Sequence, residues 1–222
     1  MKILLSFLLL AQFPVFSQVA KDANERYRTG EGREAVARGL SAPDRNAKQR
    51  PHELVEAMKI RPGTTVADVG TGVGYMLPYL SKAVGASGRV IAEDIFDDFL
   101  AKAKDAAAKA ELQNVTFVKG SETNPNLPAG GVDLILALDS YHHYDYPAKM
   151  LAGFHDALRE SGRLVIVEYY RRPEAMPGGD ALHHIRLDQP GVINEVEANQ
   201  FDLLSKHDHV KGSQYMLIFE RK

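Results

Sequence analysis

Apolar runs of strand length alternate with stretches of helical periodicity over most of this chain. The clearest such runs are Thr65–Val69, Arg89–Ala92, Val115–Val118 and Val132–Leu138. Helical stripes lie between them, and the best defined one comprises Phe96, Phe99, Leu100, Ala103, Ala107 and Ala110. This alternation predicts parallel strands joined by right-handed crossovers, with helices on both faces of one sheet. Val132–Leu138 is apolar nearly throughout, which is typical of a central strand.

Further elements are predicted on either side of this region. Pro51 and the spacing of the apolar residues predict a helix over Arg50–Ile60. Toward the C-terminus, the pattern predicts helices at Pro147–Leu158 and around Gly191–Asn199, then strands at Phe201–Lys206 and Gln214–Glu220 joined by a turn at His207–Ser213. Lys21–Gln49 is polar and rich in charge, and we expect it to be loosely helical and to lie over the domain.

The first twenty residues have the outline of a signal peptide. A lone Lys2 precedes an apolar run from Ile3 to Phe16, and small and polar residues follow. The run is shorter than the roughly 18–20 apolar residues of a spanning helix. We therefore expect cleavage after Ser17, or else after Ala20, and a periplasmic or secreted protein without a stable membrane span. The alternative is an uncleaved leader in a cytoplasmic or membrane-tethered protein.

Composition limits the class of protein. The 222 residues fit a signal peptide over 1–20, a polar extension over 21–49 and one domain over 50–222. The formal net charge of −2 provides no overall attraction to nucleic acid, so we do not expect a nucleic-acid partner. The chain has no cysteine and therefore no disulfide bond.

A glycine-rich turn joins the first predicted strand to the next helix. It contains Asp68, Gly70, Thr71, Gly72 and Gly74. Glycines let the backbone turn sharply and approach a ligand closely. A helix that begins near position 75 would direct its free N–H groups toward that ligand. The pattern Asp-x-Gly-x-Gly-x-Gly differs from the dinucleotide fingerprint G-x-G-x-x-G, in which the third glycine comes one residue later.

This pattern resembles the first motif of the class I S-adenosylmethionine-dependent methyltransferases. The strand Val132–Leu138, the His142-His143 pair and the segment Leu158–Glu168 resemble the later motifs of small-molecule members in order and spacing. That family usually has Pro-Gly-Gly where this chain has Glu160-Ser161-Gly162, in a turn. The resemblance covers Arg50 to Lys222. It implies a Rossmann-like sheet of seven strands in the order 3-2-1-4-5-7-6, with strand 7 antiparallel.

Acidic residues at the strand ends are candidates for cofactor binding. Asp94 ends the second strand 24 residues after Gly70, where a carboxylate can accept hydrogen bonds from ribose hydroxyls. It could instead begin the next helix. By resemblance, Gly70–Gly74 would hold the methionine part of S-adenosylmethionine and Asp139 its amino group. The family's usual adenine-binding acid is replaced by Ser121, so Glu122 would take that role.

Two histidine pairs are candidates for the acceptor side. His142 or His143 could remove a proton from the acceptor as a general base, or the pair could be structural. Tyr141 and Tyr170 would border the acceptor. A second pair, His183 and His184, lies in a Pro- and Gly-containing segment, 171–190, that we interpret as a substrate-covering loop. We predict no metal site, because adjacent histidines lack the i, i+4 spacing that places two ligands on one helical face.

The resulting hypothesis is an S-adenosylmethionine-dependent methyltransferase that acts on the oxygen or nitrogen of a small-molecule acceptor. One alternative is a protein that binds S-adenosylmethionine or a nucleoside without turnover. Another is an NAD-dependent oxidoreductase, which the glycine spacing and the C-terminal pair of strands disfavour. The identity of the acceptor and the oligomeric state are left open.

Overall fold

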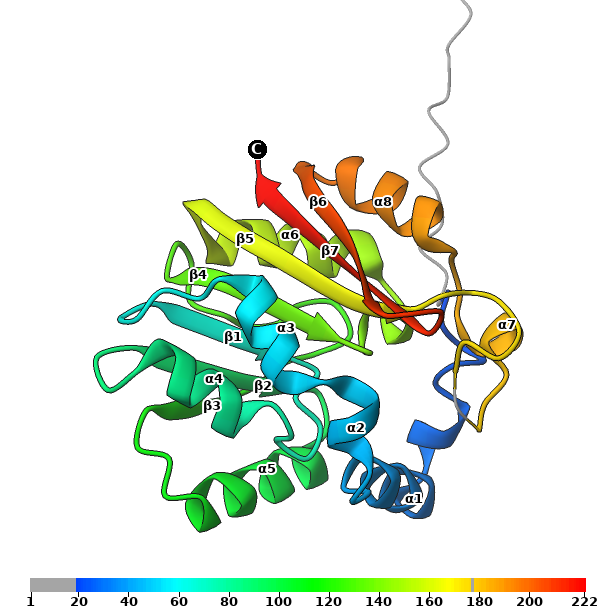
Figure 1. Ribbon diagram of the computed structural model, residues 1–222, viewed down its shortest axis with the longest axis horizontal. Helices are drawn as coiled ribbons and strands as arrows, with labels where there is room; N and C mark the ends of the chain where they lie inside the picture. The colour runs from blue at the N-terminus through cyan, green and yellow to red at the C-terminus, as the bar shows by residue number, and fades with distance from the viewer. Residues whose placement is uncertain (1–18, 177) are drawn as a thin grey trace, which may run out of the picture.

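The computed structural model describes residues 19–176 and 178–222, so most of the expected signal peptide lies outside the described residues. Within these residues, one sheet has the order β3-β2-β1-β4-β5-β7-β6 (Figure 1). Its strands are β1 Thr65–Val69, β2 Arg89–Asp94, β3 Val115–Lys119, β4 Val132–Leu138, β5 Leu158–Tyr169, β6 Phe201–Val210 and β7 Gln214–Arg221. The first five strands run parallel, and β7 pairs antiparallel with β5 and β6. The predicted strand order and orientation are confirmed.

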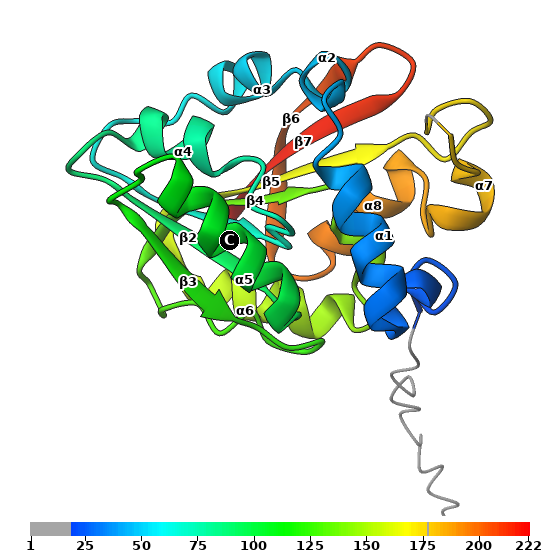
Figure 2. The same ribbon diagram turned by 90° about the horizontal axis from the view of Figure 1, so that it is seen from below.

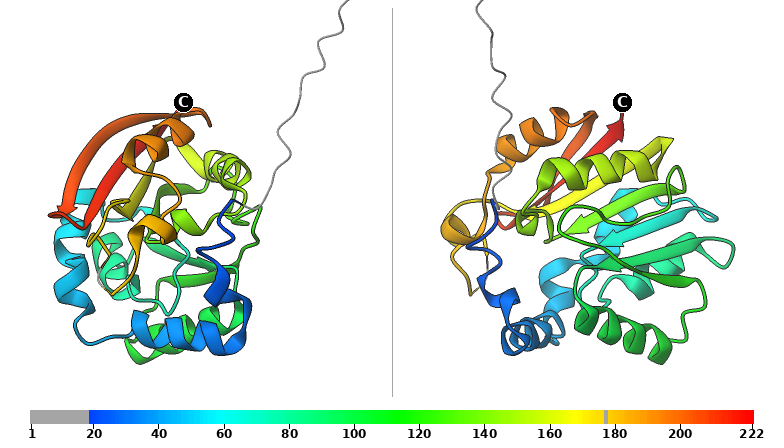
Figure 3. Two further views of the ribbon diagram at one scale, coloured as in Figure 1. Left: turned by 90° about the vertical axis from the view of Figure 1, so that its right-hand side faces the viewer. Right: turned by 180° about the vertical axis from the view of Figure 1, so that it is seen from behind.

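Helices cover both faces of the sheet (Figures 1 and 3). Their bounds are α1 Gly30–Leu40, α2 Arg45–Gln49, α3 Pro51–Met58, α4 Leu77–Val84, α5 Asp97–Lys109, α6 Pro147–Ala157, α7 Ala181–His184 and α8 Gln189–Glu197. Short 3₁₀ turns occupy Glu25–Arg28 and Tyr141–His143. One apolar cluster packs α3, α4 and α5 against the sheet, and a second packs α6 and α8 against the other face.

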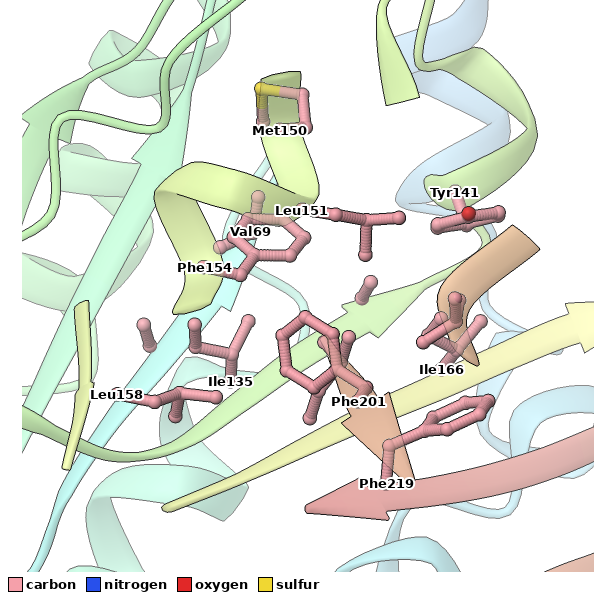
Figure 4. Close-up of a cluster of buried hydrophobic side chains, with 14 of the residues drawn as sticks. Val69, Ile135, Tyr141, Met150, Leu151, Phe154, Leu158, Ile166, Phe201 and Phe219 are labelled. Carbon is pink, nitrogen blue, oxygen red and sulfur yellow. The ribbon is translucent and has the colours of Figure 1, made fainter. Parts of the chain in front are cut away.

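The strand pattern places side chains alternately in the two clusters. On β7, Tyr215, Leu217 and Phe219 belong to the cluster under α6 and α8, whereas Met216 and Ile218 belong to the opposite cluster. Figure 4 shows the first cluster, in which Phe154, Phe201 and Phe219 come from α6, β6 and β7. Burial on both faces explains why the central strands are apolar nearly throughout.

Several predicted boundaries were wrong. β6 continues to Val210, so the turn before β7 is shorter than predicted. The predicted turn at 160–162 lies inside β5, where pairing with β4 shifts from Val132↔Leu158 to Leu134↔Arg163, so the extra residues form an irregularity rather than an end of the strand. α4 begins only at Leu77, because residues 72–76 form turns.

The polar N-terminal segment is ordered on the domain. It includes α1, whose Thr29 cap accepts a hydrogen bond from the Gly32 N–H, yet Ala37 is the one buried residue of α1. Ion pairs join α1 to α5 instead, with Arg33 2.6 Å from Asp98. Figure 2 shows α1 across the end of the sheet at which the parallel strands finish. Within residues 19–176 and 178–222, no helix is long and apolar enough to span a membrane.

Candidate functional site

A cavity of about 310 Å³ lies at the carboxyl ends of β1, β2 and β4. Its floor is formed by residues that directly follow these strands, namely Gly70, Thr71, Gly72, Asp139 and Ser140, and by Glu93 and Asp94 at the end of β2. Ligands of open α/β sheets bind at this edge because the connections diverge there. The volume is within the range of small-molecule sites.

The glycine-rich turn has a backbone that side chains would disturb. Gly70, Gly72 and Gly74 have φ of 74°, 56° and 83°, a left-handed region that favours glycine. A Cβ on Gly70 would lie 2.7 Å from the Cβ of Ser140, inside contact distance. The absence of a side chain therefore lets the turn pack against Ser140, while the N–H groups of Gly70 and Gly72 donate to Glu93 and Asp94.

The side chain of Asp68 is hydrogen-bonded to the glycine-rich turn. Its carboxylate accepts a hydrogen bond of 2.7 Å from the Thr71 hydroxyl. Asp68 is not among the described residues that line the cavity, whereas Thr71 is. Burial raises the pKa of Asp68 to about 6. Its place in the structure is therefore that of a residue that positions the turn.

Two adjacent carboxyl groups end β2. Asp94 accepts hydrogen bonds from the N–H groups of Gly72 at 2.9 Å and Phe96 at 3.0 Å, and burial raises its pKa to about 6. Glu93 accepts a bond of 3.2 Å from the Gly70 N–H through Oε2. Its Oε1 is buried and has no hydrogen-bond partner. This oxygen packs against Gly120, where an added Cβ would lie 1.6 Å from it, so the glycine makes room for the Glu93 carboxyl group.

Asp139 is held by glutamines from two distant segments. Gln214 donates to Oδ1 at 2.7 Å, and Gln49 donates to Oδ2. The residue has φ of 51°, which asparagine and aspartate tolerate better than most residues. Burial and the neighbouring charge of Glu168 raise the pKa of Asp139 to about 7. Neither glutamine carries a motif signal, so the sequence did not indicate their role.

The N-terminal segment forms the opposite wall of the cavity. The residues it contributes are Asn24, Tyr27, Arg28, Arg33, Leu40 and Arg45. Tyr27 stacks on Phe96 with ring centroids 5.9 Å apart. The guanidinium of Arg45 lies 4.0 Å from the ring centre of Tyr75. The polar composition of this segment predicted an extension that lies over the domain, and its position in the fold shows that it lines the cavity.

Ser121 and Glu122 are exposed and line the rim of the cavity. Two predicted acceptor residues lie elsewhere. The Tyr141 hydroxyl donates to Glu195 at 2.6 Å, and the Tyr170 hydroxyl donates to Asp208 at 3.2 Å. Neither tyrosine is among the described residues that line the cavity.

The structure brings three of the four candidate histidines together, namely His142, His143 and His184, and leaves His183 apart from them. His142 is 4% exposed, with Nδ1 2.6 Å from Glu168 Oε2 and Nε2 3.1 Å from His184 Nε2. His143 lines the cavity, and its Nδ1 lies 2.8 Å from Asn24 Oδ1. Burial holds the pKa of both His142 and His143 well below the usual range, so both rings are neutral. His183 is exposed and bonds to Asp180.

Comparison with known proteins agrees with this geometry. Residues 66–162 match a protein-family model described as "Methyltransferase domain". A solved S-adenosylmethionine-dependent methyltransferase from Aquifex aeolicus superimposes with a TM-score of 0.79 and 25% identity, over 85% of this chain and 98% of that one. These matches indicate a class I S-adenosylmethionine-dependent methyltransferase domain. S-adenosylmethionine is the cofactor of this domain.

Curated relatives of this methyltransferase domain are more distant. The chain is 30% identical over 135 residues to the S-adenosyl-L-methionine-dependent Diels-Alderase iccD of Talaromyces variabilis, which is 60% of this chain and 45% of that protein. It is 30% identical over 117 residues to the ubiquinone/menaquinone biosynthesis C-methyltransferase UbiE of Marinomonas sp., which is 52% of this chain and 46% of that protein. The chain thus spans less than half the length of these two relatives.

Proposed function

We propose that this protein transfers the methyl group of S-adenosylmethionine to a hydroxyl or amine of a small molecule. The observation that carries the proposal is the arrangement at the strand ends, where the glycine turn, Asp94 and Glu93 border one cavity. The sulfonium of the bound cofactor supplies an electrophilic methyl group, so the protein has mainly to align the acceptor and exclude water.

The cavity supports a division of roles among its residues. Gly70–Gly74 would hold the methionine part of the cofactor, and Asp94 would accept hydrogen bonds from the ribose. Glu122 at the rim would approach the adenine. Asp139 would face the cofactor's ammonium group. Each of its carboxylate oxygens accepts one hydrogen bond from a glutamine and keeps a lone pair for a further donor.

The acceptor would lie beside His143. This ring lines the cavity near Tyr144 and Asp145, whereas His142 lies behind it with both ring nitrogens engaged. A role at the acceptor therefore falls to His143 rather than His142. The neutral ring leaves a lone pair on the nitrogen that does not bond to Asn24.

The alternatives differ in what happens to the cofactor. One relative is named a Diels-Alderase that depends on S-adenosylmethionine, so binding without methyl transfer is the second hypothesis to test. Purified protein would be incubated with methyl-labelled S-adenosylmethionine and an extract of small molecules, with Asp94→Ala as control. We expect labelled product and an equal amount of S-adenosylhomocysteine. Cofactor binding without S-adenosylhomocysteine would contradict methyl transfer, and a rise in melting temperature with NAD alone would favour the oxidoreductase.

We also propose that residues 1–20 direct export, on the basis of the apolar run and the small residues that follow it. Ala20 is buried, and its N–H donates to Asp145 Oδ1 at 3.0 Å. Cleavage after Ser17 retains this contact, whereas cleavage after Ala20 removes it. The contact therefore favours a mature chain that begins at Gln18.

A further inference from the structure

Three histidines from two segments converge beside the cavity. His142 and His143 follow β4, and His184 ends α7; one ring nitrogen from each lies within 4.8 Å of the others. The Nε2 atoms of His142 and His184 are 3.1 Å apart. Two nitrogens bound to a tetrahedral Zn²⁺ at about 2.0–2.1 Å are separated by about 3.3 Å. The observed spacing is thus close to that of two ligands of one ion.

Hydrogen bonds orient two of the rings as metal ligands are usually oriented. His142 Nδ1 lies 2.6 Å from the carboxylate of Glu168, and His143 Nδ1 lies 2.8 Å from Asn24 Oδ1. Asn24 Nδ2 donates to the His143 carbonyl and to Asp145, which fixes the amide so that its oxygen faces His143. Both Nδ1–H groups then donate, and each Nε2 keeps a lone pair. Metal-bound histidines characteristically donate the other N–H to such a partner.

The surrounding charge also suits a cation. Glu168 is 1% exposed, and its Oε2 lies 2.6 Å from Nδ1 of His142. A dication bound to the histidines would offset the charge of this carboxylate, which is otherwise costly in a buried position.

We propose that His142, His143 and His184 bind one Zn²⁺ ion at the wall of the cavity. Three imidazoles suit Zn²⁺, whereas Mg²⁺ and Ca²⁺ prefer oxygen ligands. Three protein ligands leave a fourth position for water or a ligand oxygen, as in catalytic zinc sites. Because His143 lines the cavity, the ion would lie next to the space available to the acceptor. The site requires only these side chains, but a bound ion would occupy the same Nε2 lone pair of His143 that acceptor deprotonation would use, so His143 would serve one of the two roles at a time.

The test uses the untagged chain, stripped with a chelator and titrated with ZnCl₂. We expect one Zn²⁺ per chain after desalting, by elemental mass spectrometry, and a rise in melting temperature that MgCl₂ does not produce. His184→Gln should weaken Zn²⁺ affinity by more than about 100-fold, because a ligand is lost outright. His183→Gln is the matched control: this neighbour is 88% exposed and bonds to Asp180 outside the cluster.

Asn24→Ala provides a second measurement that leaves all three ligands in place. Loss of the residue that orients His143 should weaken Zn²⁺ binding by about 10- to 100-fold. Co²⁺ added to the wild-type chain should give the intense visible bands of a four-coordinate site, and His184→Gln should abolish them. Circular dichroism checks that the variants are folded. Equal Zn²⁺ affinity in folded His184→Gln and His183→Gln, or no bound Zn²⁺ in the wild type, would overturn the proposal.

Discussion

Replacement of Asp94 by alanine tests the cofactor assignment most directly. In the structure this carboxylate accepts hydrogen bonds from Gly72 at 2.9 Å and Phe96 at 3.0 Å while it lines the cavity. Loss of this acceptor should weaken cofactor binding by about 1–3 kcal/mol, because the ribose hydroxyls assigned to it would be left without a partner in a buried site. The dissociation constant for S-adenosylmethionine should therefore rise by about 5- to 150-fold.

The measurement is a calorimetric titration at about pH 8, where Asp94, with its pKa raised to about 6, is ionised. Asp97→Ala is the matched control, because Asp97 is an acidic neighbour whose exposed side chain pairs with Lys119. The melting temperature of the ligand-free variants shows separately how far the glycine turn depends on the carboxylate. Unchanged cofactor affinity in folded Asp94→Ala would refute the ribose assignment and direct attention to Glu93.

Three further predictions concern catalysis, pH dependence and processing. His143→Ala should lower the methyl-transfer rate by about 10²–10⁴-fold with nearly unchanged cofactor affinity, while His183→Ala keeps the wild-type rate; a folded His143→Ala with full activity would contradict this. Burial raises the pKa of Asp68 from 3.8 to about 6, so the folded state retains a proton that the unfolded state releases. The contribution of Asp68 to the free energy of unfolding should therefore fall by up to about 1.4 kcal/mol per pH unit as the pH rises from 3.8 to about 6. Urea denaturation at several pH values should show that Asp68→Asn lacks this contribution to the pH dependence. N-terminal sequencing of periplasmic protein should find Gln18 first; a start at Lys21, or full-length protein confined to the cytosol, would count against the proposed processing.

Local pattern was sufficient for the order of the elements and for the side chains that end the strands beside the cavity. Alternating apolar runs and helical stripes predicted the α/β fold, because burial on both faces requires apolar central strands. The strand order came from the resemblance to a known family. The glycine turn and Asp94 were recognisable because closely spaced residues at a strand end must meet the same edge of the sheet.

Contacts between distant segments required the tertiary structure. Asp139 was a candidate from sequence, but its partners Gln49 and Gln214 lie 90 and 75 residues away and have no local signal. The polar segment around Tyr27 has too little apolar surface to predict a packing face, yet ion pairs and ring stacking hold it over the cavity.

The histidines also show the difference between what local spacing indicates and what tertiary contacts decide. Sequence spacing argued against a metal site, because adjacent rings do not share one face of a helix. The fold instead brings His184 to His142 across 42 residues and Asn24 to His143 across 119. Residue type and local spacing thus determined which side chains lie at the strand ends. The packing of α1 and α7 over that edge decided which of these side chains face one another. Such contacts join segments that are distant in sequence, and no local pattern encodes them.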